Sequence, residues 1–139
     1  MDWLRVVVAF ILSSLAGVQA SEPAVRVSIP AVTEPTTTIP AGLRCPEFYG
    51  VALAAGWAEH EVPQVDRIMW RESRCTPTAT HLNTNGSIDR GLMQVNSIHL
   101  KWLAGYGIGA DDLLVPEWNL TAARRLYEQD GWSPWRPLP

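Results

Sequence analysis

The sequence has few charges and few cysteines, and its apolar runs are short. Only 18% of its 139 residues are charged, with 11 Lys+Arg against 14 Asp+Glu and a net charge of −3. Because nucleic-acid-binding proteins carry an excess of basic residues, we expect no nucleic-acid partner. An apolar stretch over 6–18 contains Ser13 and Ser14 and is shorter than the roughly 20 residues that span a bilayer. With 47% hydrophobic residues, the chain can form one compact domain.

The first 20 residues are typical of a secretory signal. A short polar start with Arg5 precedes the apolar stretch, which ends in Val18-Gln19-Ala20, with small or apolar residues before the predicted cut. We predict cleavage after Ala20, a secreted or cell-wall-associated protein, and no stable membrane insertion after cleavage. An uncleaved membrane anchor is the alternative. No cysteine lies near the cut, so a lipoprotein form is not supported.

Residues 21–42 contain four prolines and a threonine cluster but no aromatic residue. This composition cannot form a packed core and predicts an extended linker, or a segment without a role of its own. The folded domain is then expected over 43–139.

The two cysteines allow one intramolecular disulfide in a secreted chain, between Cys45 and Cys75. Closing that loop would stabilise the fold by roughly 3 to 4 kcal/mol. Two buried free thiols are the alternative. The three histidines have no ligand-like spacing with either cysteine, so we expect no metal site and no cofactor.

The folded region shows helical spacing in two places. A first apolar stripe has the i, i+3, i+4, i+7 pattern, and a second helix is expected to open at Pro63. The stripes are Phe48, Val51, Ala52 and Ala55, then Val65, Ile68, Met69 and Glu72. Because seven residues make almost two helical turns, Glu72 is expected to project from the apolar stripe.

A carboxylic acid in apolar surroundings resists ionisation, because its charged form loses hydration. Glu72 could therefore donate a proton near neutral pH. The alternative is that Glu72 forms an ordinary helix-end ion pair with a neighbouring arginine, and this helix alone does not separate the two.

A polar hairpin is predicted directly after this helix. Residues 76–90 are rich in Thr, Asn, Gly and Ser, and Asn85-Gly86 is a strong hairpin-turn signal. Asp89 would lie on the returning strand, 89 − 72 = 17 residues beyond Glu72. Two carboxyl groups in environments of different polarity are the basis of glycosidic-bond cleavage.

Three motifs in this order resemble the lysozyme-like superfamily of peptidoglycan-cleaving enzymes. They are Glu72-Ser73, the N-T-N-G-S-I-D-R-G hairpin over 83–91, and G-L-M-Q-V-N over 91–96. Further on, P-E-W-N-L-T-A-A over 116–123, Tyr127, and G-W-S-P-W over 131–135 are similar to bacterial soluble-lytic-transglycosylase-type domains. The resemblance covers residues 43–135.

The resemblance implies a role for each matched residue. Glu72 matches the general acid and base, and Asp89 matches the second carboxylate of animal-type lysozymes. The positions that match substrate-binding residues are Ser73, Asn83, Met93, Gln94, Asn96, Asn119 and Tyr127.

Several of these residues also have a structural interpretation. Gln94 and Asn96 could be turn and cap residues, Asn119 could bridge segments inside the fold, and Tyr127 could be a core residue with a satisfied hydroxyl group. Trp132 and Trp135 are expected to pack rather than to bind sugar.

The resemblance implies an α+β, mainly α, lysozyme-like fold with a small β-hairpin after the catalytic helix. The implied function is cleavage of the β-1,4 bond between N-acetylmuramic acid and N-acetylglucosamine, by a lytic transglycosylase that forms 1,6-anhydromuramic acid. A lysozyme is the first alternative, and a non-catalytic glycan-binding module the second. The expected partners are peptidoglycan glycan strands, and the expected state is a monomer.

Overall fold

The computed structural model describes residues 38–139, and every structural statement below concerns these residues. The predicted signal over 1–20 and most of the predicted linker, residues 21–37, lie outside the described residues. No helix between residues 38 and 139 is long and apolar enough to cross a membrane.

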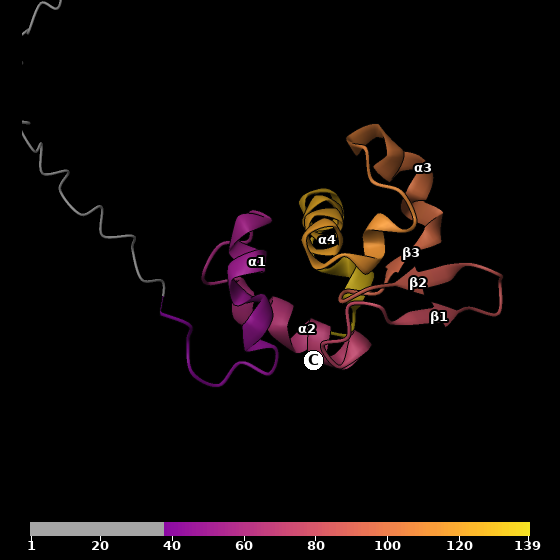
Figure 1. Ribbon diagram of the computed structural model, residues 1–139. Helices are drawn as coiled ribbons and strands as arrows, with labels where there is room; N and C mark the ends of the chain where they lie inside the picture. The colour runs from indigo at the N-terminus through magenta and orange to yellow at the C-terminus, as the bar shows by residue number, and fades with distance from the viewer. Residues whose placement is uncertain (1–37) are drawn as a thin grey trace, which may run out of the picture. The chain divides into compact units, whose positions relative to one another are not determined.

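Helices dominate the described chain, and a small antiparallel sheet lies between α2 and α3 in sequence (Figure 1). This architecture confirms the α+β, mainly α, prediction. The α-helices are α1 (Tyr49–Ala54), α2 (Val62–Ser73), α3 (Leu100–Leu103) and α4 (Pro116–Asp130), and the strands are β1 (Thr80–Leu82), β2 (Ile88–Arg90) and β3 (Val95–Asn96). Short 3-10 helices are η1 (Pro46–Phe48), η2 (Ser97–His99), η3 (Ala104–Tyr106), η4 (Asp112–Leu114) and η5 (Ser133–Trp135).

Helix α2 forms where the spacing predicted it. Val65, Ile68 and Met69 are buried in the core, and proline stands within the first two positions, where its missing N–H costs no helical hydrogen bond. The helix ends at Ser73 and is capped by Arg74, whose backbone is left-handed with φ 53°. The first predicted helix is divided, because Phe48 ends η1 and α1 begins at Tyr49.

The predicted hairpin is confirmed. Strands β1 and β2 pair antiparallel, with His81 opposite Asp89, and the turn between them contains Gly86 at φ +83°. A positive φ is easy for glycine because it has no Cβ. The sequence did not predict β3, a two-residue strand that pairs with β2 and places Asn96 opposite Asp89.

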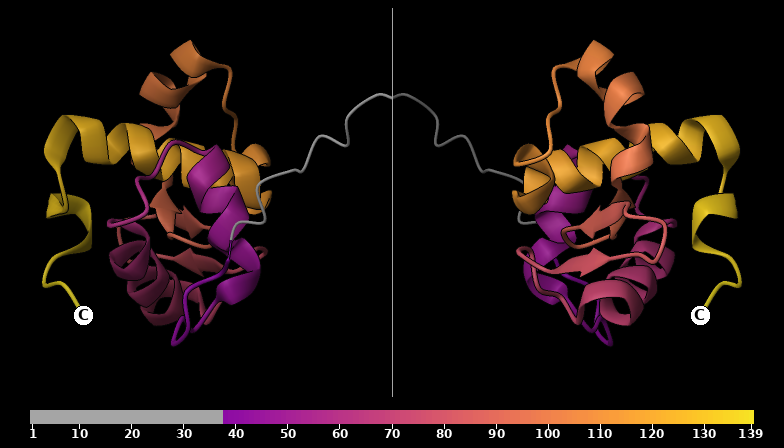
Figure 2. Two further views of the ribbon diagram at one scale, coloured as in Figure 1. Left: turned by 90° about the vertical axis from the view of Figure 1, so that its left-hand side faces the viewer. Right: turned by 90° about the vertical axis from the view of Figure 1, so that its right-hand side faces the viewer.

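Helix α4 packs against α1, and the two lie side by side in both sets of views (Figures 1 and 2). The Trp57 indole Nε1 donates a hydrogen bond to the Leu120 carbonyl at 3.1 Å, which joins the chain after α1 to α4. Trp57 also stacks on Trp132, with ring centroids 5.5 Å apart. Trp135 is buried, so both C-terminal tryptophans pack within the protein, as predicted.

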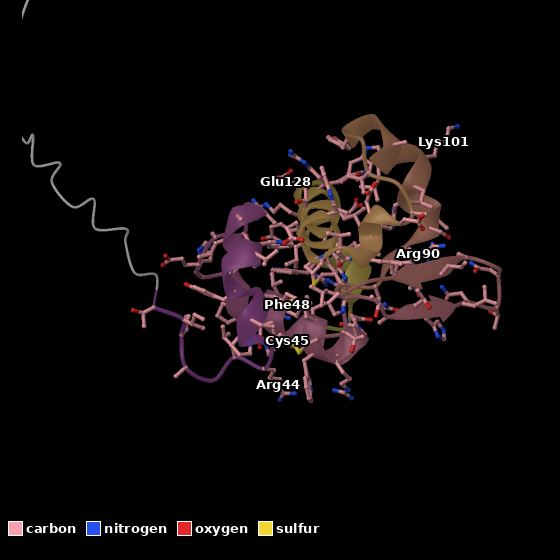
Figure 3. The ribbon with its side chains drawn as sticks, viewed as in Figure 1. Arg44, Cys45, Phe48, Arg90, Lys101 and Glu128 are labelled. Carbon is pink, nitrogen blue, oxygen red and sulfur yellow. A yellow bond between two sulfur atoms is a disulfide. The ribbon has the colours of Figure 1, made fainter. Side chains whose placement is uncertain are left out.

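The Cys45–Cys75 disulfide is confirmed, with 5.6 Å between the two Cα atoms. It joins the segment before η1 to the residue that follows the α2 cap (Figure 3). The buried Asp66 carboxylate reinforces this joint by accepting from the backbone N–H groups of Arg44 and Cys45 at 2.8 to 3.0 Å. The start of the domain is thus fixed on α2.

Candidate active site

Glu72 lies in the last turn of α2, on the edge of the apolar stripe. Its side chain is 27% exposed, whereas Ile68 and Met69, one turn earlier, are buried. The Arg71 guanidinium donates to Glu72 Oε1 from Nε at 2.9 Å and from Nη2 at 2.5 Å. The structure therefore contains the helix-end ion pair, one of the two alternatives that the sequence left open, with a Glu72 side chain that is only partly exposed.

Arg71 also holds the C-terminal segment beside Glu72. Its Nη2 donates to the Trp135 carbonyl at 2.7 Å, and its Nη1 donates to the Pro137 carbonyl. Figure 2 shows the yellow C-terminal segment turning back from the end of α4 toward α2. Sequence reasoning considered an arginine partner for Glu72 but gave no sign of these two backbone acceptors.

Ser73 ties the end of α2 to the segment that follows β2. Its side chain is buried, and its hydroxyl lies 3.0 Å from the Met69 carbonyl and 2.9 Å from the Leu92 carbonyl. A serine hydroxyl has a single hydrogen, which it shares between these two acceptors. Ser73 therefore orients Glu72 relative to the sheet, and its side chain lies inside the protein.

The Asp89 carboxylate is held by two asparagine side chains. Asn83 Nδ2 donates to Oδ2 at 2.9 Å, and Asn96 Nδ2 donates to Oδ1 at 2.6 Å. Asn83 follows β1, Asp89 lies on β2, and Asn96 lies on β3, so the three segments of the sheet converge on one carboxylate. The structure thus brings together three of the residues that the resemblance identified.

Ser87 completes this cluster, together with Asn85, and the sequence analysis named neither as a site residue. The Ser87 hydroxyl accepts from Asn83 Nδ2 at 3.2 Å and from Asn96 Nδ2 at 3.0 Å, and it donates to Asn85 Oδ1 at 2.8 Å. The polar residues at 83, 85, 87 and 89 are spaced by two. Residues 83, 85 and 87 lie between β1 and β2, however, so the alternation of side chains along a strand does not account for this spacing.

Met93 and Gln94 shape the loop between β2 and β3. Met93 is fully buried, so its side chain packs in the core. Gln94 has a positive φ of 47°, and its Nε2 donates to the carbonyls of Ala79 and Gly91 at 3.1 and 2.9 Å. Asn96, in addition to contacting Asp89, accepts from the Ile98 N–H as the N-cap of η2. The turn and cap interpretation therefore describes the contacts of Gln94 and part of those of Asn96.

Asn119 is fully buried and joins three segments. Its Nδ2 donates to the carbonyls of Arg90 and Leu113, and its Oδ1 accepts from the Met93 N–H, each at 2.8 Å. All the bonds that this side-chain amide makes in the structure are internal. Asn119 thus bridges inside the fold, and it positions the loop between Asp89 and Asn96 without contacting solvent.

Tyr127 lies away from Glu72. Its hydroxyl is bonded to Glu61, the residue before α2, and this bond raises the pKa of Tyr127 above its ordinary value of 10.0. Glu72 is 11 residues farther along the chain, or about 16 Å at 1.5 Å per residue. The structure therefore does not bring the Tyr127 hydroxyl to Glu72. Tyr127 packs against the core with its hydroxyl bonded to Glu61, which agrees with its structural interpretation.

Glu61 is the other partner in this contact. Partial burial raises its pKa, but the Ala58 N–H, the Tyr127 hydroxyl and the Arg124 charge outweigh burial and leave the pKa of Glu61 below 4.5. This cluster fixes α4 on the start of α2.

Two cavities border α2 and the C-terminal segment. One is lined by Arg44, Arg67, Trp70, Arg71, Arg74 and Pro139, and the other by Arg136, Pro137 and Leu138. Glu72 and Asp89 line neither, so both carboxylates lie outside these two cavities.

One comparison with known proteins identifies a family. A family model described as a lysozyme-like domain matches residues 49–136, more than half of the chain, and this range includes Glu72 and Asp89. No curated protein matches the chain. At the level of this family, the match indicates glycan cleavage related to peptidoglycan. On this match and on its mainly helical fold with a small antiparallel sheet, the chain belongs to the lysozyme-like domain family.

Proposed function

We propose that this protein cleaves the β-1,4 bond between N-acetylmuramic acid and N-acetylglucosamine in peptidoglycan, with Glu72 as general acid and base. The observation that supports this most strongly is the arrangement of Glu72 Oε2. Arg71 bonds only to Oε1, and Oε2 accepts no hydrogen bond within residues 38–139. One oxygen of a partly exposed carboxylate is thus fixed, while the other is available to a substrate.

The reaction begins with Glu72 protonated on Oε2. The acid transfers its proton to the glycosidic oxygen as the bond between that oxygen and C1 of the muramic acid breaks. Positive charge then develops on C1 and the ring oxygen. The Asp89 carboxylate, or the C2 acetamido oxygen of the substrate, supports that charge.

In the second step the anhydro ring closes without the participation of water. The ionised Glu72 removes the proton from the C6 hydroxyl of the same sugar, and the C6 oxygen bonds to C1 to form 1,6-anhydromuramic acid. Glu72 regains its proton, so the cycle returns to its starting state with atoms and charge balanced. This lytic transglycosylase outcome is our first candidate, because the motifs over 116–135 are similar to bacterial transglycosylase domains.

Hydrolysis by a lysozyme mechanism is the second candidate, and the Asp89 contacts favour it. Two amide donors at 2.6 and 2.9 Å orient an anionic carboxylate, as expected for a group that stabilises or bonds to C1. In that mechanism Glu72 takes the final proton from water instead of from the C6 hydroxyl.

Purified peptidoglycan tests the proposal through turbidity and mass spectrometry of the soluble fragments. We expect clearing, with muropeptides 18 Da lighter than hydrolysed ones, since anhydro formation retains no water. Hydrolysed fragments alone would contradict the transglycosylase outcome and support the lysozyme. Binding to the wall without clearing would support a non-catalytic glycan-binding module.

The Glu72→Gln variant tests the role of the acid. It cannot donate a proton, and we expect the rate to fall by roughly 10²- to 10⁴-fold. Glu47→Gln is the matched control, because Glu47 is an exposed carboxylate in η1. Equal activity of the Glu72→Gln variant and the wild type would contradict the mechanism.

We also propose that the protein acts outside the cell, as a monomer, after cleavage behind Ala20. N-terminal sequencing of exported protein should begin at Ser21, and sedimentation should give the mass of one chain. An intact leader in the exported fraction would contradict the cleavage.

A further inference from the structure

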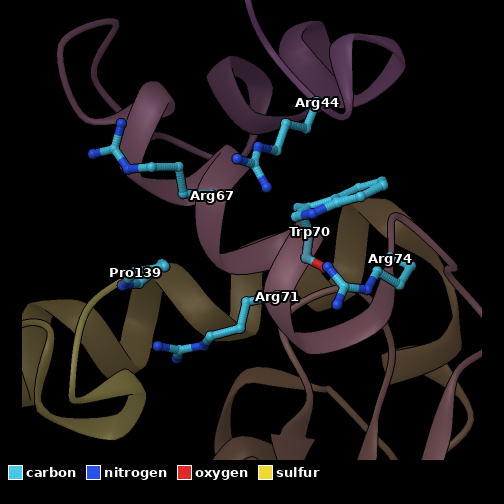
Figure 4. Close-up of a pocket in the computed structure, with 6 residues that line it drawn as sticks. All are labelled: Arg44, Arg67, Trp70, Arg71, Arg74 and Pro139. Carbon is cyan, nitrogen blue, oxygen red and sulfur yellow. The ribbon is translucent and has the colours of Figure 1, made fainter.

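A row of basic side chains occupies the face of α2 opposite its apolar stripe. Arg67, Trp70, Arg71 and Arg74 follow the i, i+3, i+4, i+7 spacing, so they share one helix face. Arg44 joins them from the preceding segment, because the Cys45–Cys75 disulfide fixes that segment beside the end of α2. We call these four arginines and Trp70 the arginine face (Figure 4).

The arginine face surrounds a cavity of about 210 Å³. Figure 4 shows Arg67 and Arg71 extending toward the C-terminal segment, with Pro139 between them. The cavity has room for about seven water molecules at 30 Å³ each, whereas cavities for drug-sized ligands begin at about 300 Å³. One small charged group, either alone or as a unit of a longer chain that continues along the helix, fits this space.

The positive charges of the arginine face are poorly compensated. Ion pairs within residues 38–139 form at Arg71, Arg124 and Arg125, so Arg44, Arg67 and Arg74 have no carboxylate within 4.0 Å there. Asp66, the nearest buried acid to Arg44, directs its carboxylate to backbone N–H groups instead. In a chain of net charge −3, this face is a local excess of positive charge.

Trp70 holds two of these guanidinium groups in place. The Arg44 and Arg74 carbons Cζ lie 5.6 and 4.9 Å from the centroid of the Trp70 ring, and Figure 4 shows them above and below the indole. A guanidinium that stacks on an aromatic ring presents its edge N–H groups away from the ring. Arg74 Nη1 donates to the Trp70 carbonyl at 3.2 Å and Arg67 Nη2 donates to Gln64 Oε1 at 2.5 Å, which leaves the other nitrogens of these two groups for an oxyanion. Because guanidinium groups cover the ring from both sides, neither a sugar nor a nucleobase can stack on it.

We propose that the arginine face binds a phosphodiester-linked polyol, a polyanion without bases. Arginine pairs with phosphate oxygens through two parallel N–H donors. From Arg67 to Arg74 the helix rises about 10 Å. This length is greater than that of one anionic group, so it suits a chain that carries repeated charges. A membrane surface is less well matched, because interfacial binding needs inserted apolar side chains around the basic ones, and arginines surround Trp70.

Isothermal titration of the full chain with a synthetic glycerol-phosphate decamer tests this site. The test variant is Arg44→Gln with Arg67→Gln, which leaves Arg71, the partner of Glu72, untouched. The control is Lys101→Gln with Arg125→Gln. Both residues are exposed, and the two substitutions remove the same amount of positive charge from another part of the surface. Figure 3 shows Lys101 and Arg44 at distant parts of the domain.

We expect at least a tenfold loss of decamer affinity in the test variant and less than a twofold loss in the control. Wild-type affinity should fall steeply as salt increases, because charge neutralisation releases counterions. Both variants should keep wild-type glycan cleavage, so this proposal can fail independently of the proposed function. If the double variant does not fold, Arg67→Gln alone gives the test, since Arg67 is exposed.

Four results would overturn the proposal. The first is no wild-type binding to the decamer, and the second is an equal loss in both variants. The third is equal or tighter binding to a polyglutamate or oligothymidine decamer, which would show charge attraction without preference for a polyol phosphate. The fourth is binding to phosphatidylglycerol vesicles but not to the decamer, which would identify a lipid surface as the partner.

Discussion

Arg71 and Glu72 are adjacent in sequence, and two nitrogens of Arg71 share one oxygen of Glu72. Nε and Nη2 lie 2.9 and 2.5 Å from Oε1, and the same guanidinium bonds to the carbonyls of Trp135 and Pro137. The orientation of the proposed acid therefore depends on the segment that follows α4.

Arg71→Ala should lower the free energy of unfolding by about 1 to 3 kcal/mol, because two backbone carbonyls lose their donor. The coupling energy between Arg71→Ala and Glu72→Gln should be only about 0.5 to 1 kcal/mol, since both side chains are partly exposed, at 32% and 27%. A double-mutant cycle by urea denaturation measures both quantities. Zero coupling would mean that the pair does not form in solution.

Asn96→Ala should slow glycan cleavage roughly 10- to 100-fold. Asp89 loses a charged hydrogen bond of about 1.5 to 3 kcal/mol, and each 1.36 kcal/mol corresponds to a factor of ten in rate. Asn85→Ala is the control, because Asn85 contacts Ser87 but not Asp89. Initial rates of peptidoglycan clearing test the difference, and equal rates for the two variants would show that orientation of Asp89 does not matter.

Gly91→Ala should destabilise the protein by several kcal/mol. A Cβ there would lie 2.1 Å from the Leu113 carbonyl oxygen and 2.2 Å from Asn119 Nδ2, and Gly91 has φ +76°. Gly105→Ala is the control, because a Cβ at Gly105 meets no atom within 4 Å. Thermal unfolding compares them, and similar midpoints would contradict the packing around Gly91.

Replacing both cysteines by serine should lower the free energy of unfolding by about 3 to 4 kcal/mol. The disulfide closes a loop with sequence separation 30, and without it the unfolded chain gains conformational entropy. Denaturation of the variant, compared with the oxidised wild type, measures the loss. Wild-type protein unfolded in excess reductant should give a similar value, and a loss below about 1 kcal/mol in both would contradict the prediction.

Glu61 should stabilise the fold only when it is ionised. Its folded pKa lies below the unfolded value of 4.5, so its contribution is present above pH 4.5 and is lost as the pH falls through the folded pKa. Glu61→Gln should therefore be less stable than the wild type at pH 7, and the difference should shrink below pH 4.5. Glu59→Gln, an exposed control, should show little difference at either pH. A difference for Glu61→Gln that does not change with pH would contradict the prediction.

Local patterns in the sequence predicted the elements that carry the carboxylates. The spacing of Val65, Ile68 and Met69 predicted α2, and Asn85-Gly86 predicted the hairpin, because both signals lie within one element. The disulfide followed from having only two cysteines. Strand β3 was missed because two residues are too few to show a period.

The contacts around the carboxylates depend on tertiary structure, and periodicity does not report them. Periodicity placed Glu72 on the apolar side of α2, but it could not show that Arg71 binds both Glu72 and the Trp135 carbonyl of the chain after α4. Tyr127 was assigned to the substrate site by resemblance, yet its hydroxyl bonds to Glu61 at the far end of α2. No local pattern indicates which distant residue a side chain will meet.

The single amide of Asn119 has consequences for engineering this domain. Because it bonds to Arg90, Met93 and Leu113, the end of the hairpin and the loop before α4 share one fixed point. Since all three partners are backbone groups, grafting a new hairpin from a related domain would require keeping Asn119 and the backbone conformation at residues 90, 93 and 113. Libraries that vary the hairpin tip should therefore leave them constant, so that changes in specificity are not masked by misfolding.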